Sequence, residues 1–440
     1  MVVSPARLAA FNILLRVERE SAFAVELLHS ALLDELSAID RGLATELVMG
    51  VLRWRSLLDA AIAYLSFTPF KKLDFEVLTA LRLGVYQKQF LSKIPSHAVV
   101  NETVELVKYA KKTSAAGLAN AVMRKVKSGG VTHASNMESV ERLAAELAHP
   151  KWLVERWAQG FGYDTARQIC EHDQRVPATA LRIGEAKDEE KLREEGIQLA
   201  PGAVMRSARV GATGDITSNA LFRNGKIAIQ DEGSQLVAAL VGEGTRILDC
   251  CAAPGGKTSA LATRLPEAEI FAADLHPHRA RLLRRLASQT NVHVVASDAL
   301  ALPFRSDFDR VLADVPCSGT GTLARNPEIK WKLRPEDLAD LQQRQVAILR
   351  AAMQHVAPGG RLIYSTCSME PEENEQVVKA CLQSENEFKV VPVRDELVRL
   401  QESGDLAWQN IDQFVRNDFL RTIPGVQPCD GFFAAILQRC

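Results

Sequence analysis

From Gly244 onward, short apolar runs alternate with amphipathic helical stretches, and this alternation limits the fold more than any other feature of the chain. The runs are TRILDC, EIFAADL, VHVVASD, FDRVLADV and GRLIYSTC, separated by stretches such as HRARLLRRLASQ and PEDLADLQQRQVAILRAAMQHV. Continuous apolar runs suit strands buried on both faces, and strands that alternate with helices form parallel sheets. The pattern predicts an α/β, doubly wound domain, and DGFFAAILQRC predicts a last strand at the far end of the sheet.

The chain before Gly244 has two other patterns. Residues 4–127 predict one helix after another, starting with Ser4 as cap and Pro5 at the first helical position, and with Asp40 capping a helix that runs from DRGLATELV to AIAYL. Helical stretches at 139–175 are followed by short strands mixed with helical linkers. We therefore predict an all-α domain over residues 1–130, a small α+β segment over residues 131–235 and the α/β domain over residues 236–440.

Composition limits the class of protein. The 440 residues are too many for one ordinary core, and 47% hydrophobic with 24% charged residues is typical of globular proteins. No apolar run has transmembrane length and no signal-peptide pattern is present, so we expect a cytoplasmic protein without a membrane partner. Eight cysteines are too few for a disulfide scaffold, and no Cys/His cluster has zinc spacing, so we expect no metal.

Charge is unevenly distributed. Residues 1–130 hold 17 lysines and arginines against 12 aspartates and glutamates, a net charge of +5, although the whole chain carries −1. A basic segment on a near-neutral protein suggests a polyanionic partner such as nucleic acid. On charge alone, a solvated helical surface explains the excess equally well.

The segment ILDCCAAPGGKTSALATRL predicts a strand, a glycine-bearing loop and a helix. In a doubly wound sheet such a loop lies at the ligand crevice, where backbone N–H groups and a helix N-terminus suit a carboxylate or a phosphate. The tail GGKT allows a phosphate-binding P-loop as the second interpretation. That motif requires glycine at position 251, where this chain has Cys251, and Pro254 removes one of the N–H groups.

Three aspartates follow successive predicted strands. Asp274 ends the second strand, where a carboxylate can accept hydrogen bonds from a ribose diol, and Asp298 ends the third, near the expected position of an adenine amino group. Asp314 ends the fourth. A single strand-end aspartate is often a helix cap. Three of them beside a glycine loop predict a nucleoside pocket, with the reacting group toward Asp314.

Two cysteines follow neighbouring predicted strands, Cys317 after the fourth and Cys367 at the end of the fifth. A thiolate that adds to C6 of a cytosine makes C5 nucleophilic toward a methyl group, and a second thiol can assist release of the first. Asp314 could then hydrogen-bond the N3/N4 edge of the base. The predicted helix that starts after Cys367 would lower the pKa of its thiol, whereas Glu370, Glu372 and Glu373 would raise this pKa, so the net direction stays open.

Together the segments CAAPGGKT, AADL, SDAL, ADVPCSGTG with NPEIKW, YSTCSMEPEENE and DGFF resemble the motifs of the bacterial RNA (cytosine-5) methyltransferases that use S-adenosylmethionine. The resemblance implies a class I methyltransferase fold, with Cys367 as nucleophile, Cys317 assisting product release and Lys257 steadying Asp314. It also implies a cofactor site at Cys251, Ala252, Ala253, Pro254, Gly255, Gly256, Lys257, Asp274, Asp298 and Asp314. Cys250 is an additional thiol that this resemblance leaves without a role.

The N-terminal segments DRGLATELVMGVLRWRSLLD and PSHAVVNETVELVK resemble the NusB-like RNA-binding domain. The fusion implies a branch of the family that acts on 16S rRNA or on an assembling small ribosomal subunit, as a monomer, with Arg41, Arg53 and Arg55 as phosphate contacts. Salt bridges at the surface explain these arginines nearly as well. The other interpretations are the same reaction on another rRNA or tRNA, a P-loop nucleotide hydrolase, and a non-catalytic RNA-binding assembly factor.

Overall fold

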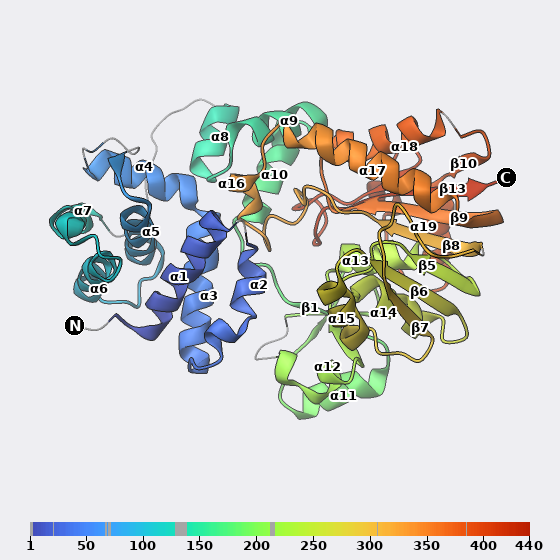
Figure 1. Ribbon diagram of the computed structural model, residues 1–440, viewed down its shortest axis with the longest axis horizontal. Helices are drawn as coiled ribbons and strands as arrows, with labels where there is room; N and C mark the ends of the chain where they lie inside the picture. The colour runs from blue at the N-terminus through green and yellow to red at the C-terminus, as the bar shows by residue number, and fades with distance from the viewer. Residues whose placement is uncertain are drawn as a thin grey trace. The chain divides into compact units, whose positions relative to one another are not determined.

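The computed structural model describes residues 3–440 except 21, 67, 69–71, 128–138, 212–215, 306 and 384. The chain divides into two compact units (Figure 1). Unit 1 consists of residues 1–176 together with the short segment Leu323–Leu333, and unit 2 consists of residues 177–322 and 334–440. The predicted domain boundary after residue 130 lies outside the described residues, and the three predicted parts stay a prediction.

Unit 1 is helical. Its helices are α1 (Pro5–Arg19), α2 (Ala24–Leu28), α3 (Ala38–Arg53), α4 (Arg55–Ser66), α5 (Phe75–Phe90), α6 (Ser96–Tyr109), α7 (Ala116–Lys125), α8 (Val140–Glu146), α9 (Lys151–Phe161), α10 (Tyr163–Asp173) and α16 (Ile329–Lys332), with short 3-10 turns at Ala31–Leu33 and Thr113–Ala115. Helix α5 is central: residues 77–87 are all buried, so it is enclosed by its neighbours. Pro5 begins α1 as predicted because its fixed φ suits a first helical position.

Two predicted details of the N-terminal helices are wrong. The helix expected to start at Asp40 begins at Ala38, and its cap is Ser37, whose hydroxyl accepts a hydrogen bond from the Asp40 amide. The expected single helix is broken at Trp54, which separates α3 from α4. The break was missed because apolar spacing continues across Trp54, whereas the cap was misplaced because Ser37 and Asp40, three residues apart, are both residue types that cap helices.

The segment Leu323–Leu333 comes from the α/β half of the sequence but belongs to unit 1. Lys330 Nζ donates to the backbone oxygens of Arg53 and Ala148, at 2.9 and 3.0 Å, and the Trp331 indole donates to the Leu52 oxygen at 2.6 Å. Arg53 in turn donates to the Ala324 oxygen at 2.9 Å. The last carbonyls of α3 have no partners within the helix, so the segment supplies them.

Unit 2 starts with a small antiparallel sheet in the order β2-β3-β1-β4. Its strands are β1 (Ala180–Ile183), β2 (Ala200–Pro201), β3 (Ala208–Val210) and β4 (Ile227–Ile229), accompanied by α11 (Ala186–Glu194), the turn Ile216–Ser218 and α12 (Ala220–Arg223). Its small core contains Leu181, Ile183, Leu192 and Ile227. This is the α+β segment that the sequence indicates.

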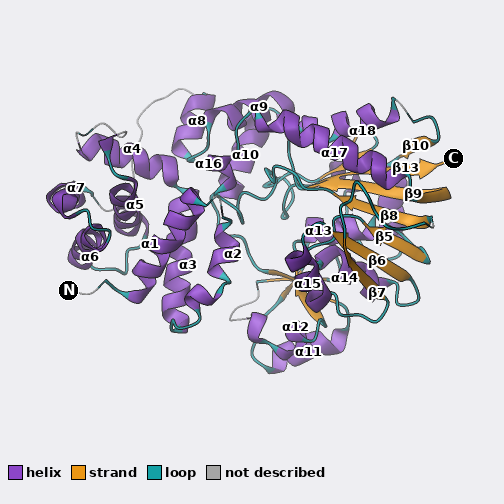
Figure 2. Ribbon diagram, in the orientation of Figure 1, coloured by secondary structure: helices purple, strands orange, loops and turns teal. Residues whose placement is uncertain are grey.

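The main sheet has the order β11-β12-β13-β9-β8-β5-β6-β7, with β10 paired to β13 (Figure 2). Its strands are β5 (Arg246–Asp249), β6 (Glu269–Asp274), β7 (Val292–Ala296), β8 (Phe308–Asp314), β9 (Val356–Thr366), β10 (Phe388–Val391), β11 (Val415–Arg416), β12 (Phe419–Arg421) and β13 (Phe433–Arg439). Strands β5 to β9 pair in parallel. The predicted α/β doubly wound fold is therefore confirmed.

Helices cover both faces of this sheet because neighbouring residues of each strand point to opposite sides. Ile247 packs with one group of helices, and the adjacent Leu248 packs with the other. The first group is α13 (Glu232–Ala239), α14 (Gly256–Arg264) and α19 (Val393–Glu402); the second is α17 (Asp337–Met353) and α18 (Glu375–Leu382), with the turn Pro371–Glu373 before α18. A further helix, α15 (Pro277–Leu286), packs beside β6 and β7, and the turn Ile411–Phe414 precedes β11.

The sequence suggested that the final strand lies at the far end of the sheet, but this strand lies inside the sheet. Strand β13 runs antiparallel to β9, and both β12 and β10 pair with its other side. The two extra strands are too short to stand out as apolar runs in the sequence. Among the described residues, none of the helices combines the length and the apolar character that a bilayer crossing needs.

Candidate active site

The predicted site residues of unit 2 lie at the carboxyl ends of the parallel strands, which meet at one edge of the sheet. Asp314 ends β8 and pairs in register with Ser365 of β9, so the loops that follow these two strands start side by side. Cys317 lies in the first loop and Cys367 in the second. The sequence placed these strands as neighbours, and the sheet order confirms it.

The two thiols are in direct contact, with 3.3 Å between Cys317 Sγ and Cys367 Sγ. Their loops are also joined through the backbone, because the Gly321 amide donates to the Cys367 oxygen at 2.9 Å and the Gly431 amide donates to the Gly321 oxygen at 2.7 Å. A β-carbon on Gly321 would lie 2.1 Å from the Gly431 oxygen. Glycine is therefore required where PCSGTG packs against DGFF.

The hydrogen bond with Cys367 and burial hold the pKa of the Cys317 thiol well above its ordinary value, and the charges of Cys367, Glu373 and Asp314 act in the same direction. Cys317 is thus a protonated thiol at neutral pH, able to donate a proton or a hydrogen bond to the sulfur beside it. Burial likewise raises the pKa of Cys250 and Cys251, which disfavours the thiolate form of both thiols in the preceding loop.

Asp314 is held from two sides. Its Oδ2 accepts a hydrogen bond from Lys257 Nζ at 2.7 Å, and its Oδ1 accepts one from Ser365 Oγ at 2.7 Å. Burial opposes the charged form of Lys257, but Asp314, with smaller contributions from Cys367 and Asp249, outweighs it and raises the pKa of the lysine. The lysine predicted to steady Asp314 therefore contacts it as a permanent cation.

The glycine loop turns sharply between β5 and α14. The Ala253–Pro254 peptide is cis, and Gly255 has φ +112°, a conformation that glycine adopts without strain. Gly255 precedes α14, whose first residue is Gly256, so the first N–H groups of α14, which have no partner within the helix, lie at the end of this loop. Ala252 and Ala253 are buried against α15, and Pro254 is exposed.

The remaining aspartates flank this loop. Asp274 ends β6 and is buried, with Oδ1 accepting from the His276 amide at 3.1 Å, whereas Asp298 follows β7 and is exposed. A fourth aspartate, Asp249 at the end of β5, is one that sequence reasoning missed. Burial, opposed by a hydrogen bond from Thr258, raises its pKa to about 7, and its Oδ1 is buried without a hydrogen-bond partner among the described residues. Its position at a strand end was the available signal.

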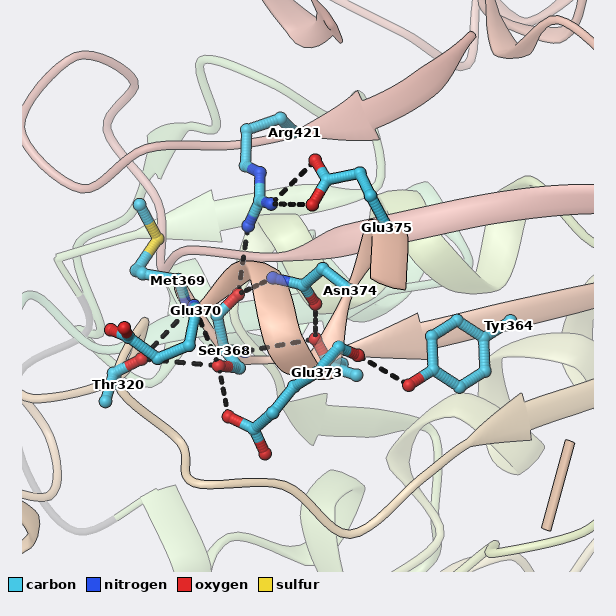
Figure 3. Close-up of polar contacts among 10 residues, drawn as sticks. Thr320, Tyr364, Ser368, Met369, Glu370, Glu373, Asn374, Glu375 and Arg421 are labelled. Carbon is cyan, nitrogen blue, oxygen red and sulfur yellow. Dashed lines mark hydrogen bonds and ion pairs between the residues drawn. The ribbon is translucent and has the colours of Figure 1, made fainter. Parts of the chain in front are cut away.

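A buried polar network that the sequence did not indicate joins the two cysteine loops, and Figure 3 shows its part around Ser368, Glu373 and Asn374. The carboxylate of Glu373 accepts hydrogen bonds from the residue after each cysteine, Ser318 and Ser368. Asn374 accepts from Thr366 and donates to the Ser368 oxygen, at 2.5 and 2.9 Å. The glutamate expected to repel a thiolate thus serves as a hydrogen-bond acceptor, although its charge contributes to the raised pKa of Cys317.

The three arginines predicted to contact RNA lie in unit 1 in different environments. Arg53 is 3% exposed, and its guanidinium hydrogen-bonds the Ala324 oxygen. Arg55 forms a two-bond pair with Glu18, at 2.7 and 2.8 Å, and its guanidinium lies over the Trp331 ring. Arg41, in the first turns of α3, is partly exposed. Their contact with phosphate stays a prediction.

Comparison with known proteins agrees with both halves of the chain. The family described as 16S rRNA methyltransferase RsmB/F matches residues 237–438, the NusB family matches residues 4–128, and a ferredoxin-like domain of RsmF/B-like methyltransferases matches residues 149–209. A solved structure, that of PH0851, covers the whole of both chains with a TM-score of 0.81 at 23% identity, which supports the fold alone. The fold and site thus define a Rossmann-like methyltransferase joined to a NusB-like helical domain.

Curated relatives identify the family. The probable ribosomal RNA small subunit methyltransferase B of Bacillus subtilis (strain 168) is 34% identical over 98% of each chain. Ribosomal RNA small subunit methyltransferase B of Pseudomonas putida is 35% identical, covering 80% of this chain and 83% of its own. The chain belongs to the ribosomal RNA small subunit methyltransferase B family, which confirms the predicted resemblance.

The predicted cofactor, S-adenosylmethionine, is confirmed by this family, and the residues present fit it. The unpartnered Asp249 oxygen can accept a hydrogen bond from the amino group of its methionine part, and the N-terminus of α14 suits its carboxylate. That Asp274 and Asp298 contact the ribose and the adenine stays a prediction. The methyltransferase assignment also removes the reason for reading GGKT as a phosphate cradle.

Proposed function

We propose that this protein transfers a methyl group from S-adenosylmethionine to C5 of one cytosine in 16S rRNA, through a covalent bond between Cys367 and C6 of the base. The observation that carries the proposal is the 3.3 Å contact between two thiols beside a charged Asp314–Lys257 pair and the cofactor loop. The rRNA target rests on the relatives, which are named for the small ribosomal subunit.

Cys367 acts first. Its thiolate forms a bond to C6, and the electron pair of the C5–C6 double bond becomes available at C5. S-adenosylmethionine, when bound, would supply an electrophilic methyl group, which C5 takes with that electron pair while the electrons of the broken S–CH3 bond stay on the sulfur of the departing S-adenosylhomocysteine. Asp314 accepts a hydrogen bond from the N3/N4 edge of the base; each of its oxygens already accepts one bond, and each has a lone pair left.

Release requires the C5 proton and the sulfur to leave. A base takes the C5 proton, the C–H electron pair rebuilds the C5–C6 double bond, and the C6–S bond breaks with its electrons on Cys367. Cys317 lies in contact with that sulfur and is protonated, so it stabilises the departing thiolate by hydrogen bonding or by proton transfer. The target base has to be single-stranded or turned out of its stack to reach both thiols.

A denaturing gel tests this chemistry directly. Labelled 16S rRNA and S-adenosylmethionine would be mixed with wild-type protein, Cys317→Ala, Cys367→Ala and Cys440→Ala, the last being an exposed cysteine outside the site. We expect a covalent protein–RNA band to accumulate with Cys317→Ala and none to form with Cys367→Ala, while Cys440→Ala behaves as wild type. Unimpaired methylation by Cys367→Ala would overturn the covalent mechanism.

The position of the methyl group is a separate question. Nuclease digestion of the methylated RNA followed by mass spectrometry would identify the modified nucleoside, which we expect to be 5-methylcytidine. A methyl group on N4 of cytosine or on another base would overturn the C5 assignment. Methylation of transfer RNA in preference to 16S rRNA would instead redirect the substrate and leave the chemistry intact.

A further inference from the structure

Glu373 is buried in unit 2 directly behind the two cysteine loops, with 0% of its surface exposed. Its Oε1 accepts hydrogen bonds from the Ser318 amide and from Gln345 Nε2, both at 2.8 Å. Its Oε2 accepts from Ser368 Oγ at 2.5 Å and from Ser318 Oγ. One carboxylate therefore joins the residue after Cys317 to the residue after Cys367.

The contacts reach both sides of Cys317. Gln345 of α17, held by Glu373, also donates to the Pro316 oxygen at 3.0 Å, so the residues before and after Cys317 are attached to the same group. The two serines also contact each other, with 3.0 Å between Ser318 Oγ and Ser368 Oγ.

The loop that carries Cys367, and Glu373 itself, are held in place by Arg421 and Tyr364. The Arg421 guanidinium donates to the Ser368 oxygen at 3.0 Å and pairs with Glu375 at 3.2 Å (Figure 3). The Tyr364 hydroxyl donates to the backbone oxygen of Glu373 at 2.6 Å. Glu373 itself thus occupies a fixed position from which its carboxylate reaches both loops.

The hydrogen-bond partners of the Glu373 side chain explain why a carboxylate suits this position. Glu373 forms no ion pair within the described part of the chain, and its side chain accepts hydrogen bonds from Ser318, Gln345 and Ser368, which are all neutral donors. Burying an unpaired charge is expensive unless hydrogen bonds compensate it. A glutamine has only one acceptor atom, so its NH₂ group would face the two serine hydroxyls, which would then have to accept instead of donate, and the charge would be lost. A carboxylate suits this position because both of its oxygens accept, so that the amide and hydroxyl of Ser318, the hydroxyl of Ser368 and the amide of Gln345 can all donate at once.

We propose that Glu373 is a positioning residue, which holds Cys317 and Cys367 in contact so that one thiol can assist release of the other. This inference rests on the proposed function for its meaning, but the geometric claim can be tested without RNA. Glu373 does not touch substrate or cofactor; it acts through the two serines.

The first test measures thiol geometry alone. Full-length protein would be equilibrated with reduced and oxidised glutathione near pH 7, and the Cys317–Cys367 disulfide would be quantified by peptide mass spectrometry. The equilibrium gives the effective concentration of one thiol at the other, and glutathione supplies the oxidant. We expect Glu373→Gln to lower this effective concentration by about tenfold or more, since a buried hydrogen bond to a charged group is lost.

Two further variants separate the effect of side-chain length from the effect of charge and from general destabilisation. Glu373→Asp keeps the charge but is one methylene shorter, and it should resemble Glu373→Gln. Glu396→Gln removes another buried carboxylate of unit 2, on α19, and should resemble wild type. Wild-type effective concentration in Glu373→Gln, or full recovery in Glu373→Asp, would overturn the proposal. If Glu373→Gln does not fold, the Ser318→Ala, Ser368→Ala double variant replaces it, with the same expected decrease.

The second test links geometry to turnover. In single-turnover reactions Glu373→Gln should accumulate the covalent protein–RNA band seen with Cys317→Ala. In steady-state assays it should lower kcat by about tenfold or more, while KM for RNA changes less than about threefold. A change in KM alone would overturn the positioning role. Should no covalent band form even with Cys317→Ala, the proposed function fails, and the glutathione result still decides the geometric claim.

Discussion

Lys257 and Asp314 form a 2.7 Å ion pair that is largely removed from solvent, with 12% and 26% of their side chains exposed. The lysine comes from the first turn of α14, after the glycine loop, and the aspartate ends β8. The pair therefore connects the cofactor loop to the strand that leads to Cys317. The ring of Phe432, from the segment DGFF, lies 5.0 Å from the lysine ammonium.

Replacing Lys257 by Met should weaken both stability and cofactor binding. Removing one partner leaves the other charge partly buried and uncompensated, which costs about 1–3 kcal/mol once the exposure of Asp314 is considered. Urea unfolding and calorimetric titration with S-adenosylmethionine would measure the two effects. The control is Arg264→Met on the same helix, whose pair with Asp405 is more exposed and should contribute less than about 1 kcal/mol.

Replacing Gly321 by Ala should disrupt the junction of the two cysteine loops. The added β-carbon would lie 2.1 Å from the Gly431 backbone oxygen, and backbone cannot move aside as a side chain can. We expect a loss of about 2 kcal/mol or more in the free energy of unfolding, together with loss of methylation. Gly117→Ala in α7, where nothing lies within 4 Å, should be neutral or slightly stabilising. Equal effects of the two substitutions would contradict this account.

Lys330 should make the stability of unit 1 depend on pH. Burial lowers its pKa to about 7, although Asp173 and Cys170 favour the charged form and Arg53 disfavours it. Because the folded pKa lies below the unfolded value of 10.5, the unfolded chain binds more protons between these two pH values, and the free energy of unfolding rises with pH there.

The measurement compares wild type with Lys330→Met, which cannot titrate at this position. Wild type should gain stability relative to the variant between about pH 7 and pH 10, by at most roughly 1.4 kcal/mol per pH unit. Lys108→Met, at a half-exposed lysine paired with Glu105, should give a curve parallel to wild type. Parallel curves for Lys330→Met would contradict the burial of a titrating lysine.

Arg41 and Arg53 should separate RNA binding from stability. Arg41 is partly exposed, so Arg41→Ala should weaken RNA binding and reduce the salt dependence of the affinity by about one phosphate contact. Arg53 is buried, so Arg53→Ala should lower the stability of unit 1 by about 1–3 kcal/mol, because its guanidinium supplies a buried hydrogen bond. RNA titrations at several salt concentrations, with thermal unfolding of both variants, would check this; an unchanged salt slope in Arg41→Ala would remove Arg41 from the interface.

Local pattern was sufficient for much of this protein. The alternation after Gly244 predicted the parallel sheet, and strand ends predicted that Asp274, Asp314, Cys317 and Cys367 lie along one edge of it. These features follow from the chain itself, since an apolar run specifies a buried strand and the residue after it lies at the end of that strand. The glycine loop was predictable because it also follows directly after an apolar run.

Distant contacts were not encoded in any single segment. The sequence suggested that Glu373 repels a thiolate and that Arg53 faces RNA; packing makes one a shared acceptor and buries the other. Likewise NPEIKW follows the Cys317 motif, yet the segment Leu323–Leu333 belongs to the helical unit. Sequence by itself determined the elements and the residues at their ends. Only the tertiary structure decided which groups meet, because hydrogen-bond partners of buried polar atoms are chosen by long-range packing rather than by neighbours in the chain.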